Sequence, residues 1–176
     1  MLRAVFDSSA LITCCQAATS GKPVIEHVLA VCTVTIPIAV RNEVLVMSHQ
    51  YADARLASDL MTAESIRVEK VALPPGNILD HYRLGAGEKE AIALYLDKSD
   101  QFGFLVTDDR LAYVVSNRCA IPTSLFLDLL IEMVERGLMA VDLAQEIAEA
   151  VQLRYAAGFV HHTLKMIERG DRKCLA

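Results

Sequence analysis

The chain has 176 residues, of which 53% are hydrophobic and 22% are charged. This length and composition predict one domain with a full core, and they exclude a disordered or collagen-like chain. Seventeen basic and twenty-two acidic side chains leave a formal net charge of −5. The acidic balance argues against a protein that coats nucleic acid through its net charge, although a local basic patch can still guide a strand.

The cysteines and the N-terminal segment indicate a reduced, soluble protein. Five cysteines occur without C-x-x-C spacing and without a cysteine–histidine cluster typical of zinc sites, namely Cys14, Cys15, Cys32, Cys119 and Cys174. We expect most of them to be small core residues. The apolar start of the chain reaches Asp7 too early for a signal peptide, and no run approaches the ~18–20 apolar residues of a membrane span. The prediction is a cytoplasmic protein without a membrane segment.

The first half of the chain alternates short apolar runs with helical patterns. Residues 2–6 suit a buried parallel strand that stops at Asp7. Ser8 and Ser9 are good N-caps for a helix over residues 10–17, and residues 19–23 break the chain. The pattern then predicts a helix over residues 24–31, a strand over 33–36, a helix that begins at Pro37, a helix over 52–62 and a strand over 66–71.

The second half continues the alternation after a predicted loop at residues 74–76, where two prolines precede a glycine. The predicted elements are a helix over 88–97, a strand over 103–107, a helix over 110–117, a strand over 119–121, a helix opened by residues 122–124 that ends near Gly137, and helices over 140–152 and 155–169. Short strands that alternate with helices predict an α/β fold, a three-layer α/β/α sandwich around a central parallel sheet.

Acidic residues follow two of the predicted strands. Asp7 ends the first strand, and Asp108 and Asp109 end the strand that begins near residue 103. Ligands of open parallel sheets bind outside the carboxyl ends of the strands, so these side chains are expected to share one rim. Glu43 lies on the helix after the second strand, within about two turns of its start. Converging carboxylates repel one another unless a metal neutralises them, and Mg²⁺ or Mn²⁺ suits such an oxygen-only site.

Each acid also has a structural interpretation. Glu88 and Glu90 fall in the first turn of a predicted helix, where the helix dipole favours a carboxylate. Asp108 suits the N-cap of the following helix, and Glu43 suits an ordinary helix surface. Asp7 is the hardest to explain in this way, because a carboxylate directly after a buried strand is costly without a partner.

Four segments of the sequence, in order, resemble the PIN-domain ribonucleases. They are residues 5–12 (VFDSSALI), 36–44 (IPIAVRNEV), 87–94 (GEKEAIAL) and 105–110 (LVTDDR). The resemblance covers about residues 1–140, which it implies form a PIN-like nuclease domain. Residues 141–176 are then a C-terminal helical extension, packed on the domain or on a partner.

The resemblance implies that one acid from each motif holds a divalent metal. Asp7 and Glu43 match the first two motifs. In the third motif Glu90 is preferred, because Ala91 follows it, and Glu88 is the alternative. Asp109 matches the fourth motif, with Asp108 beside it. Ser8 or Ser9 matches a hydroxyl that orients a carboxylate or water.

The implied activity is Mg²⁺- or Mn²⁺-dependent hydrolysis of single-stranded RNA. Arg110 and Arg118, with Lys89 and Lys98, lie near the predicted rim and are candidates for contacting the RNA backbone, although a solvated helix surface explains them equally well. Other family members are toxins of toxin–antitoxin pairs, so an antitoxin partner is a further expectation. PIN proteins commonly form homodimers, and here the helices over 24–31 and 52–62 are candidate contacts.

Two alternatives belong to other functional classes. A receiver-type phosphoacceptor needs paired acids after the first strand and a lysine after a late strand, and residues 7–9 and 121–122 lack them. A catalytically degenerate PIN-like module would bind RNA or protein without cutting, and the retention of all four acid positions argues against it. From Arg154 onward, five basic residues outnumber two acidic ones, which indicates a solvated tail or one that pairs with RNA or an acidic partner.

Overall fold

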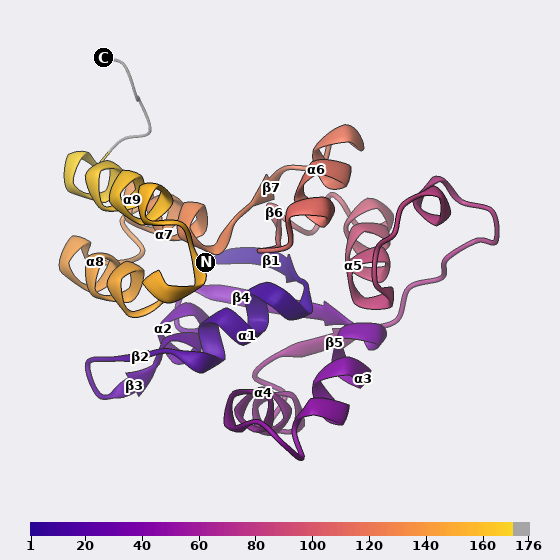
Figure 1. The fold of residues 1–176 in the computed structure, drawn as a ribbon, viewed down its shortest axis with the longest axis horizontal. Helices are drawn as coiled ribbons and strands as arrows, with labels where there is room; N and C mark the ends of the chain where they lie inside the picture. The colour runs from indigo at the N-terminus through magenta and orange to yellow at the C-terminus, as the bar shows by residue number, and fades with distance from the viewer. Residues whose placement is uncertain (171–176) are drawn as a thin grey trace.

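Five parallel strands form the centre of the molecule over residues 1–170, which the computed structural model describes (Figure 1). Their spatial order is β5-β4-β1-β6-β7. The strands are β1 (Leu2–Phe6), β4 (Cys32–Pro37), β5 (Arg67–Glu69), β6 (Phe104–Val106) and β7 (Thr123–Ser124). In the register of the sheet, Phe6 lies opposite Val106, and Val5 lies opposite Thr35.

Strand β1 is buried on both faces from Ala4 to Phe6, and of its five residues only Arg3 is exposed. Leu2, Ala4 and Phe6 enter one hydrophobic core, and Val5 enters the other. Side chains alternate between the two faces of a strand, so a strand of the middle layer is apolar on both faces wherever helices cover it. The predicted three-layer α/β/α sandwich is confirmed.

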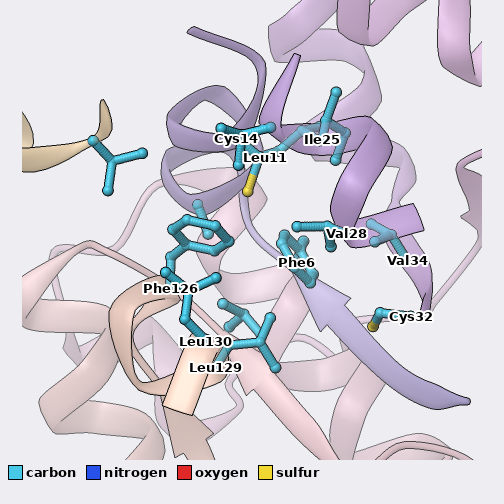
Figure 2. Packing of buried hydrophobic residues seen from close by; sticks show 14 of the residues in the cluster. Phe6, Leu11, Cys14, Ile25, Val28, Cys32, Val34, Phe126, Leu129 and Leu130 are labelled. Atoms are coloured by element: carbon cyan, nitrogen blue, oxygen red, sulfur yellow. The ribbon is translucent and has the colours of Figure 1, made fainter. Parts of the chain in front are cut away.

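The larger core lies between the sheet and helices that include α1 (Ser8–Gln16), α2 (Val24–Leu29), α7 (Phe126–Glu135), α8 (Val141–Ala150) and α9 (Ala157–Arg169), and α3 (Ile38–Met47) and α4 (Ala52–Thr62) also contribute buried residues to it. Figure 2 shows Phe6 of β1 pointing into this core, with Ile25 and Val28 of α2 on one side and Phe126 and Leu130 of α7 on the other. The smaller core lies under α5 (Ala86–Asp97) and α6 (Arg110–Arg118). Near β5, α3 and α4 pack against each other (Figure 1).

Two local predictions are wrong. The last strand is Thr123–Ser124 instead of residues 119–121, and the helix after it begins at Phe126. Cys119 caps the end of α6, and the chain then turns through Ala120, whose φ is 57°, before it can pair with β6.

The predicted break at residues 19–23 is a short hairpin of β2 (Ala18–Thr19) and β3 (Lys22–Pro23). Its turn has positive φ at Ser20 and Gly21, as two-residue hairpins require.

The C-terminal helices share the larger core with the sheet. Ile147 of α8 and Val160 and Ile167 of α9 belong to the same cluster as Phe6. Residues 141–170 of the predicted extension thus pack on the rest of the chain, while residues 171–176 lie outside the described part. The boundary near residue 140 stays a prediction.

The cysteines agree with their predicted core role. Cys14, Cys15 and Cys32 are buried free thiols, and Cys119 is a half-buried one. Cys174 lies outside the described residues. Within residues 1–170, none of the helices combines the length and apolar character needed to cross a bilayer.

Candidate active site

The order of the strands reverses at β1. The chain builds β4 and β5 on one side of β1 and then β6 and β7 on the other. In open parallel sheets, ligands bind at such a switch point, outside the carboxyl ends of the two strands that flank it. Asp7 follows β1 here, and Thr107, Asp108 and Asp109 follow β6. The predicted placement of these strand-end acids at one rim matches the topology.

Asp7 is a buried carboxylate, 1% exposed, that caps the first turn of α1. Its Oδ1 accepts hydrogen bonds from the Ala10 N–H at 2.9 Å and from the Ser9 hydroxyl at 2.7 Å, and its Oδ2 accepts one from the Thr107 hydroxyl. The N-cap is therefore Asp7, and the prediction that Ser8 and Ser9 take this role is wrong. Both serines lie in the first turn of the helix itself.

Burial raises the pKa of Asp7 from its ordinary value of 3.8 to about 6. The three hydrogen bonds favour the ionised form and oppose this rise, while the negative charge of Asp108 adds to it. An ionised Asp7 is thus costly in the protein alone. A bound cation would lower this cost.

Ser9 and Thr107 join the ends of β1 and β6. The Ser9 Oγ, which donates to Asp7, accepts a hydrogen bond from the Asp108 N–H at 2.9 Å. The Thr107 Oγ accepts one from the Asp109 N–H at 3.1 Å. Ser9 therefore orients a carboxylate as expected, whereas Ser8 makes no side-chain hydrogen bond to the described residues. Thr107 was missed as a site residue, although a threonine directly before two strand-end aspartates was a usable signal.

The neighbours Asp108 and Asp109 have different partners. Asp109 caps α6, with Oδ1 accepting from the Ala112 N–H at 2.7 Å. Both oxygens of Asp108 are bound within the protein. Oδ1 accepts from the Phe126 N–H at 3.1 Å, and Oδ2 accepts from the hydroxyls of Thr13 and Tyr155, each at 2.7 Å. Asp108 ties α1, α7 and the segment just before α9 together at the site.

The three glutamates lie where α3 meets α5. The Glu43 Oε1 accepts from the Gly87 N–H at 2.9 Å, and the Glu90 Oε2 accepts from the Ala39 N–H at 2.8 Å. Glu88 accepts from the Gly85 N–H at 2.5 Å. Burial raises the pKa of Glu88, and the negative charges of Asp109 and Glu43 raise it further. Glu88 thus lies within electrostatic reach of two other candidate acids, while the Glu90 carboxylate is directed to the start of α3.

A cavity of about 520 Å³ opens beside these acids. Its lining combines acidic, polar, apolar and basic side chains: Ser9, Gln16, Glu88, Asp108, Asp109, Leu153 and Arg154. Arg154 ends the short helix η2 (Gln152–Arg154), and its guanidinium donates to the Gln16 Oε1 at 3.0 Å. No local motif pointed to Arg154. It reaches the cavity only because α8 and α9 fold back over the sheet.

The predicted RNA contacts are spread along the surface. Arg110 begins α6 beside the acids, but Arg118 ends that helix, about 12 Å away along its axis. The structure therefore does not bring Arg118 to the strand ends. Lys89 forms an ion pair with Asp80 at 3.1 Å, and Lys98 pairs with Glu69.

The acids fit a divalent metal in chemistry but not as a preformed cluster. Within residues 1–170, no group of three His, Cys, Asp or Glu side chains is placed to hold a metal ion. Asp7, Glu43, Glu88 and Asp109 each bind a backbone N–H at a helix N-terminus instead. Their hard carboxylate oxygens are the donors that Mg²⁺ and Mn²⁺ prefer. Of these four acids, Glu88 and Asp109 line the cavity itself.

Two solved structures are similar to this chain. A PilT N-terminus domain protein from the hyperthermophilic archaeon Sulfolobus solfataricus P2 is 15% identical, with a TM-score of 0.50 over 74% of this chain and 92% of its own. A domain of a functionally unknown protein from Methanocaldococcus jannaschii DSM 2661 is also 15% identical, with a TM-score of 0.46 over 71% of this chain and 91% of its own. At this identity the first similarity shows the fold alone.

The family is identified by a family model and not by a single relative. No curated protein matches the chain. The family DUF3368, described as a PIN domain, matches residues 3–169, which include the C-terminal helices α8 and α9. That match spans nearly the whole sequence and includes all four acidic motifs, and the chain therefore belongs to the PIN-domain family.

Proposed function

We propose that the protein is a divalent-metal-dependent endoribonuclease that hydrolyses phosphodiester bonds of single-stranded RNA. The observation that carries this proposal is the acidic cavity at the switch point of the sheet, where Glu88 and Asp109 line the wall. Asp7 lies at the end of the neighbouring strand, and Glu43 is close enough to raise the pKa of Glu88. Membership of the PIN-domain family supports a nuclease.

The proposed ligands of Mg²⁺ or Mn²⁺ are Asp7, Glu43, Glu88 and Asp109. A bound ion would supply a lowered pKa of the attacking water and stabilisation of charge on the leaving oxygen. We prefer Glu88 to Glu90 in this set, because Glu88 lines the cavity whereas the Glu90 carboxylate binds the Ala39 N–H. Glu90 then keeps α3 and α5 in place.

The remaining polar residues position these acids. Ser9 and Thr107 hold the two oxygens of the buried Asp7, so this carboxylate is fixed before RNA arrives. Asp108 fixes the chain around Tyr155, which brings Arg154 to the cavity. Arg154 supplies positive charge for a phosphate of the substrate. Hydrolysis forms a bond from a water oxygen to phosphorus and breaks the P–O bond to a ribose oxygen, which takes up a proton.

One observation favours the alternative of a PIN-like module that binds RNA or a protein without cutting. Each proposed ligand already binds a helix N-terminus, and no three of them are clustered within residues 1–170. Carboxylates in such positions stabilise helices without any metal.

The test is cleavage of single-stranded RNA by the full chain with Mn²⁺, with Mg²⁺ and with EDTA. We expect cleavage with either ion, none with EDTA, and at least a hundredfold loss in Asp7→Asn. Asp59→Asn changes an exposed carboxylate on α4 and is the matched control. Each ion should also raise the melting temperature of the wild type more than that of Asp7→Asn, because a ligand of the folded state stabilises it. RNA binding without cleavage under any of these ions would favour the binding module.

We further propose a cytoplasmic setting and a toxin role. The buried free thiols of Cys14, Cys15 and Cys32 support a reducing compartment. The toxin role rests on the family alone. Induced expression should arrest growth with the wild type and not with Asp7→Asn, and a small protein encoded next to this one should reverse the arrest.

A further inference from the structure

A second cavity lies beside the acidic one. It has a volume of about 350 Å³ and shares Asp108 and Arg154 with the acidic cavity. Its walls come from α6, from the start of α7 and from the start of α9, which contribute Tyr113, Leu125 and Phe159. The two cavities thus form one continuous surface, with Arg154 between an acidic half and an aromatic half.

Phe159 is the unexpected residue in this cavity. It lies in the first turn of α9, and 57% of its surface is exposed, while its neighbour Val160 is buried in the larger core. A large exposed aromatic ring that lines a cavity is costly in water and is typical of a binding surface.

The wall opposite the solvent is held rigidly. The Tyr155 hydroxyl donates to the Asp108 Oδ2, and the other carboxylate oxygen, Oδ1, accepts from the Phe126 N–H at the start of α7. This bond fixes the chain just before Phe159, so the aromatic half keeps its shape without a ligand. A preformed site loses less conformational entropy when it binds.

The charges of the second cavity favour a neutral group over a phosphate. Arg110 and Arg154 line it together with Asp108 and Asp128, so the four charges balance. A volume of this size suits a small planar ligand. Nucleobases are neutral and planar, and single-stranded RNA is bound largely by stacking of its bases on aromatic side chains.

We propose that this second cavity binds one nucleobase of the RNA substrate. Phe159 and Tyr113 contact the base, and Arg154 contacts the phosphate that leads from it into the acidic cavity. The proposal rests on the proposed function for the identity of the ligand. It extends that function by assigning a substrate-binding role to the C-terminal helix α9, which carries none of the four acidic motifs.

The first experiment uses a fluorescent reporter. The chain has no tryptophan, so Phe159→Trp places a single indole in the cavity. Titration with a 12-nucleotide single-stranded RNA in EDTA should quench its fluorescence, because the stacked base is in contact with the ring. Leu96→Trp, at an exposed position near the end of α5, is the control and should not respond.

The second experiment removes either the ring or the base. Phe159→Ala should weaken binding of the same RNA about tenfold, as expected for one stacked base, while Leu96→Ala should not weaken it. An abasic nucleotide at the bound position should weaken binding to the wild type by a similar factor and should make no further difference to Phe159→Ala. Melting curves check that each variant is folded.

The outcomes separate this proposal from the proposed function. Metal-dependent cleavage with unchanged RNA binding by Phe159→Ala would overturn the base-binding cavity alone. A tenfold loss of RNA binding in Phe159→Ala, with no cleavage by the wild type under Mn²⁺ or Mg²⁺, would overturn the proposed nuclease and support the base-binding cavity. No RNA binding by the wild type would also overturn the base-binding role of the second cavity.

Discussion

Glu43 and Glu90 bind the first turns of each other's helices. Glu43 on α3 accepts a hydrogen bond from Gly87 at the start of α5, and Glu90 on α5 accepts one from Ala39 at the start of α3. Each carboxylate therefore lies at the positive end of the other helix dipole. The reciprocal arrangement fixes the angle between α3 and α5. It also directs Glu90 away from Glu88, which lines the acidic cavity.

This difference predicts separate effects for Glu88→Gln and Glu90→Gln. The first change should reduce cleavage at least a hundredfold, because a proposed metal ligand loses its charge, and it should also destabilise the start of α5, where Glu88 accepts from the Gly85 N–H. The second should lower the free energy of unfolding by about 1 kcal/mol and reduce cleavage less, because a carboxylate at a helix N-terminus becomes neutral. Melting curves and Mn²⁺-dependent cleavage check both. A larger loss of cleavage in Glu90→Gln than in Glu88→Gln would identify Glu90 as the ligand.

A second prediction concerns the close approach of Glu43 to Gly87. A Cβ added at Gly87 would lie 2.6 Å from the Glu43 Oε2 and 2.9 Å from its Oε1. Gly87→Ala should therefore displace this carboxylate and reduce cleavage at least tenfold, with a loss of stability of about 1–3 kcal/mol. Cleavage and thermal unfolding check these effects.

Gly158→Ala is the matched control for Gly87→Ala. Gly158 is also the second residue of its helix, and a Cβ there meets no atom within 4 Å. This variant should be neutral or slightly more stable, since alanine favours a helix over glycine. Equal behaviour of the two variants would show that the space above Gly87 is not needed.

The raised pKa of Asp7 predicts a pH dependence of stability in EDTA. The folded protein holds the proton of Asp7 up to about pH 6, whereas an ordinary aspartate loses it near pH 3.8. The unfolded chain therefore gains when the carboxyl ionises, and the contribution of Asp7 to stability falls as the pH rises from about 4 through about 6. Two pKa units correspond to on the order of 3 kcal/mol.

Asn at this position cannot ionise, so the difference between Asp7→Asn and wild type should change in favour of the variant from pH 4.5 to pH 7. Urea unfolding at intermediate pH values measures this difference. Asp59→Asn, at an exposed site, provides the comparison. A constant difference between Asp7→Asn and wild type across this range would contradict the prediction.

The sequence was sufficient for the sheet and for its acidic rim. Strands such as β1 are mostly apolar because both faces are buried, and Asp7 and Asp109 follow the ends of β1 and β6. The exception, β7, consists of Thr123 and Ser124, which have no apolar pattern. Its position depends on the left-handed turn at Ala120 and on pairing with β6, and both are properties of the folded chain.

The parts of the site that were not predicted depend on contacts between distant segments. Local patterns could not separate Glu88 from Glu90, because the choice depends on where α3 packs against α5. They could not distinguish Asp108 from Asp109 either, since the partners of Asp108 include Thr13 and Tyr155. Arg154 reaches the cavity for the same reason.

Tyr155→Phe tests the bond that holds the C-terminal helices at the site. The Tyr155 hydroxyl donates to Asp108, and burial, with the negative charge of Asp108, raises the pKa of Tyr155 far above its ordinary value. Its removal should lower the free energy of unfolding by about 1–3 kcal/mol, because a carboxylate oxygen loses a charge-assisted hydrogen bond. It should also weaken RNA binding, because Arg154 and Phe159 lose their fixed positions. Tyr113→Phe keeps the ring in the same cavity and should preserve stability.

Finally, we propose that two copies of the chain associate through the junction of α3 and α4. Of the two predicted contact helices, α2 has its apolar residues, among them Ile25, buried in the chain's own core, so α2 covers the sheet. Exposed apolar side chains lie instead at Val46 and Tyr51, which are 74% and 53% exposed, with Met47 between them. A stable dimer requires about 1,200–2,000 Å² of buried surface in total. Light scattering at tens of micromolar should give the dimer mass for the wild type and for Leu96→Asp, and the monomer mass for Val46→Asp. A monomeric wild type, or a Val46→Asp dimer, would contradict this interface.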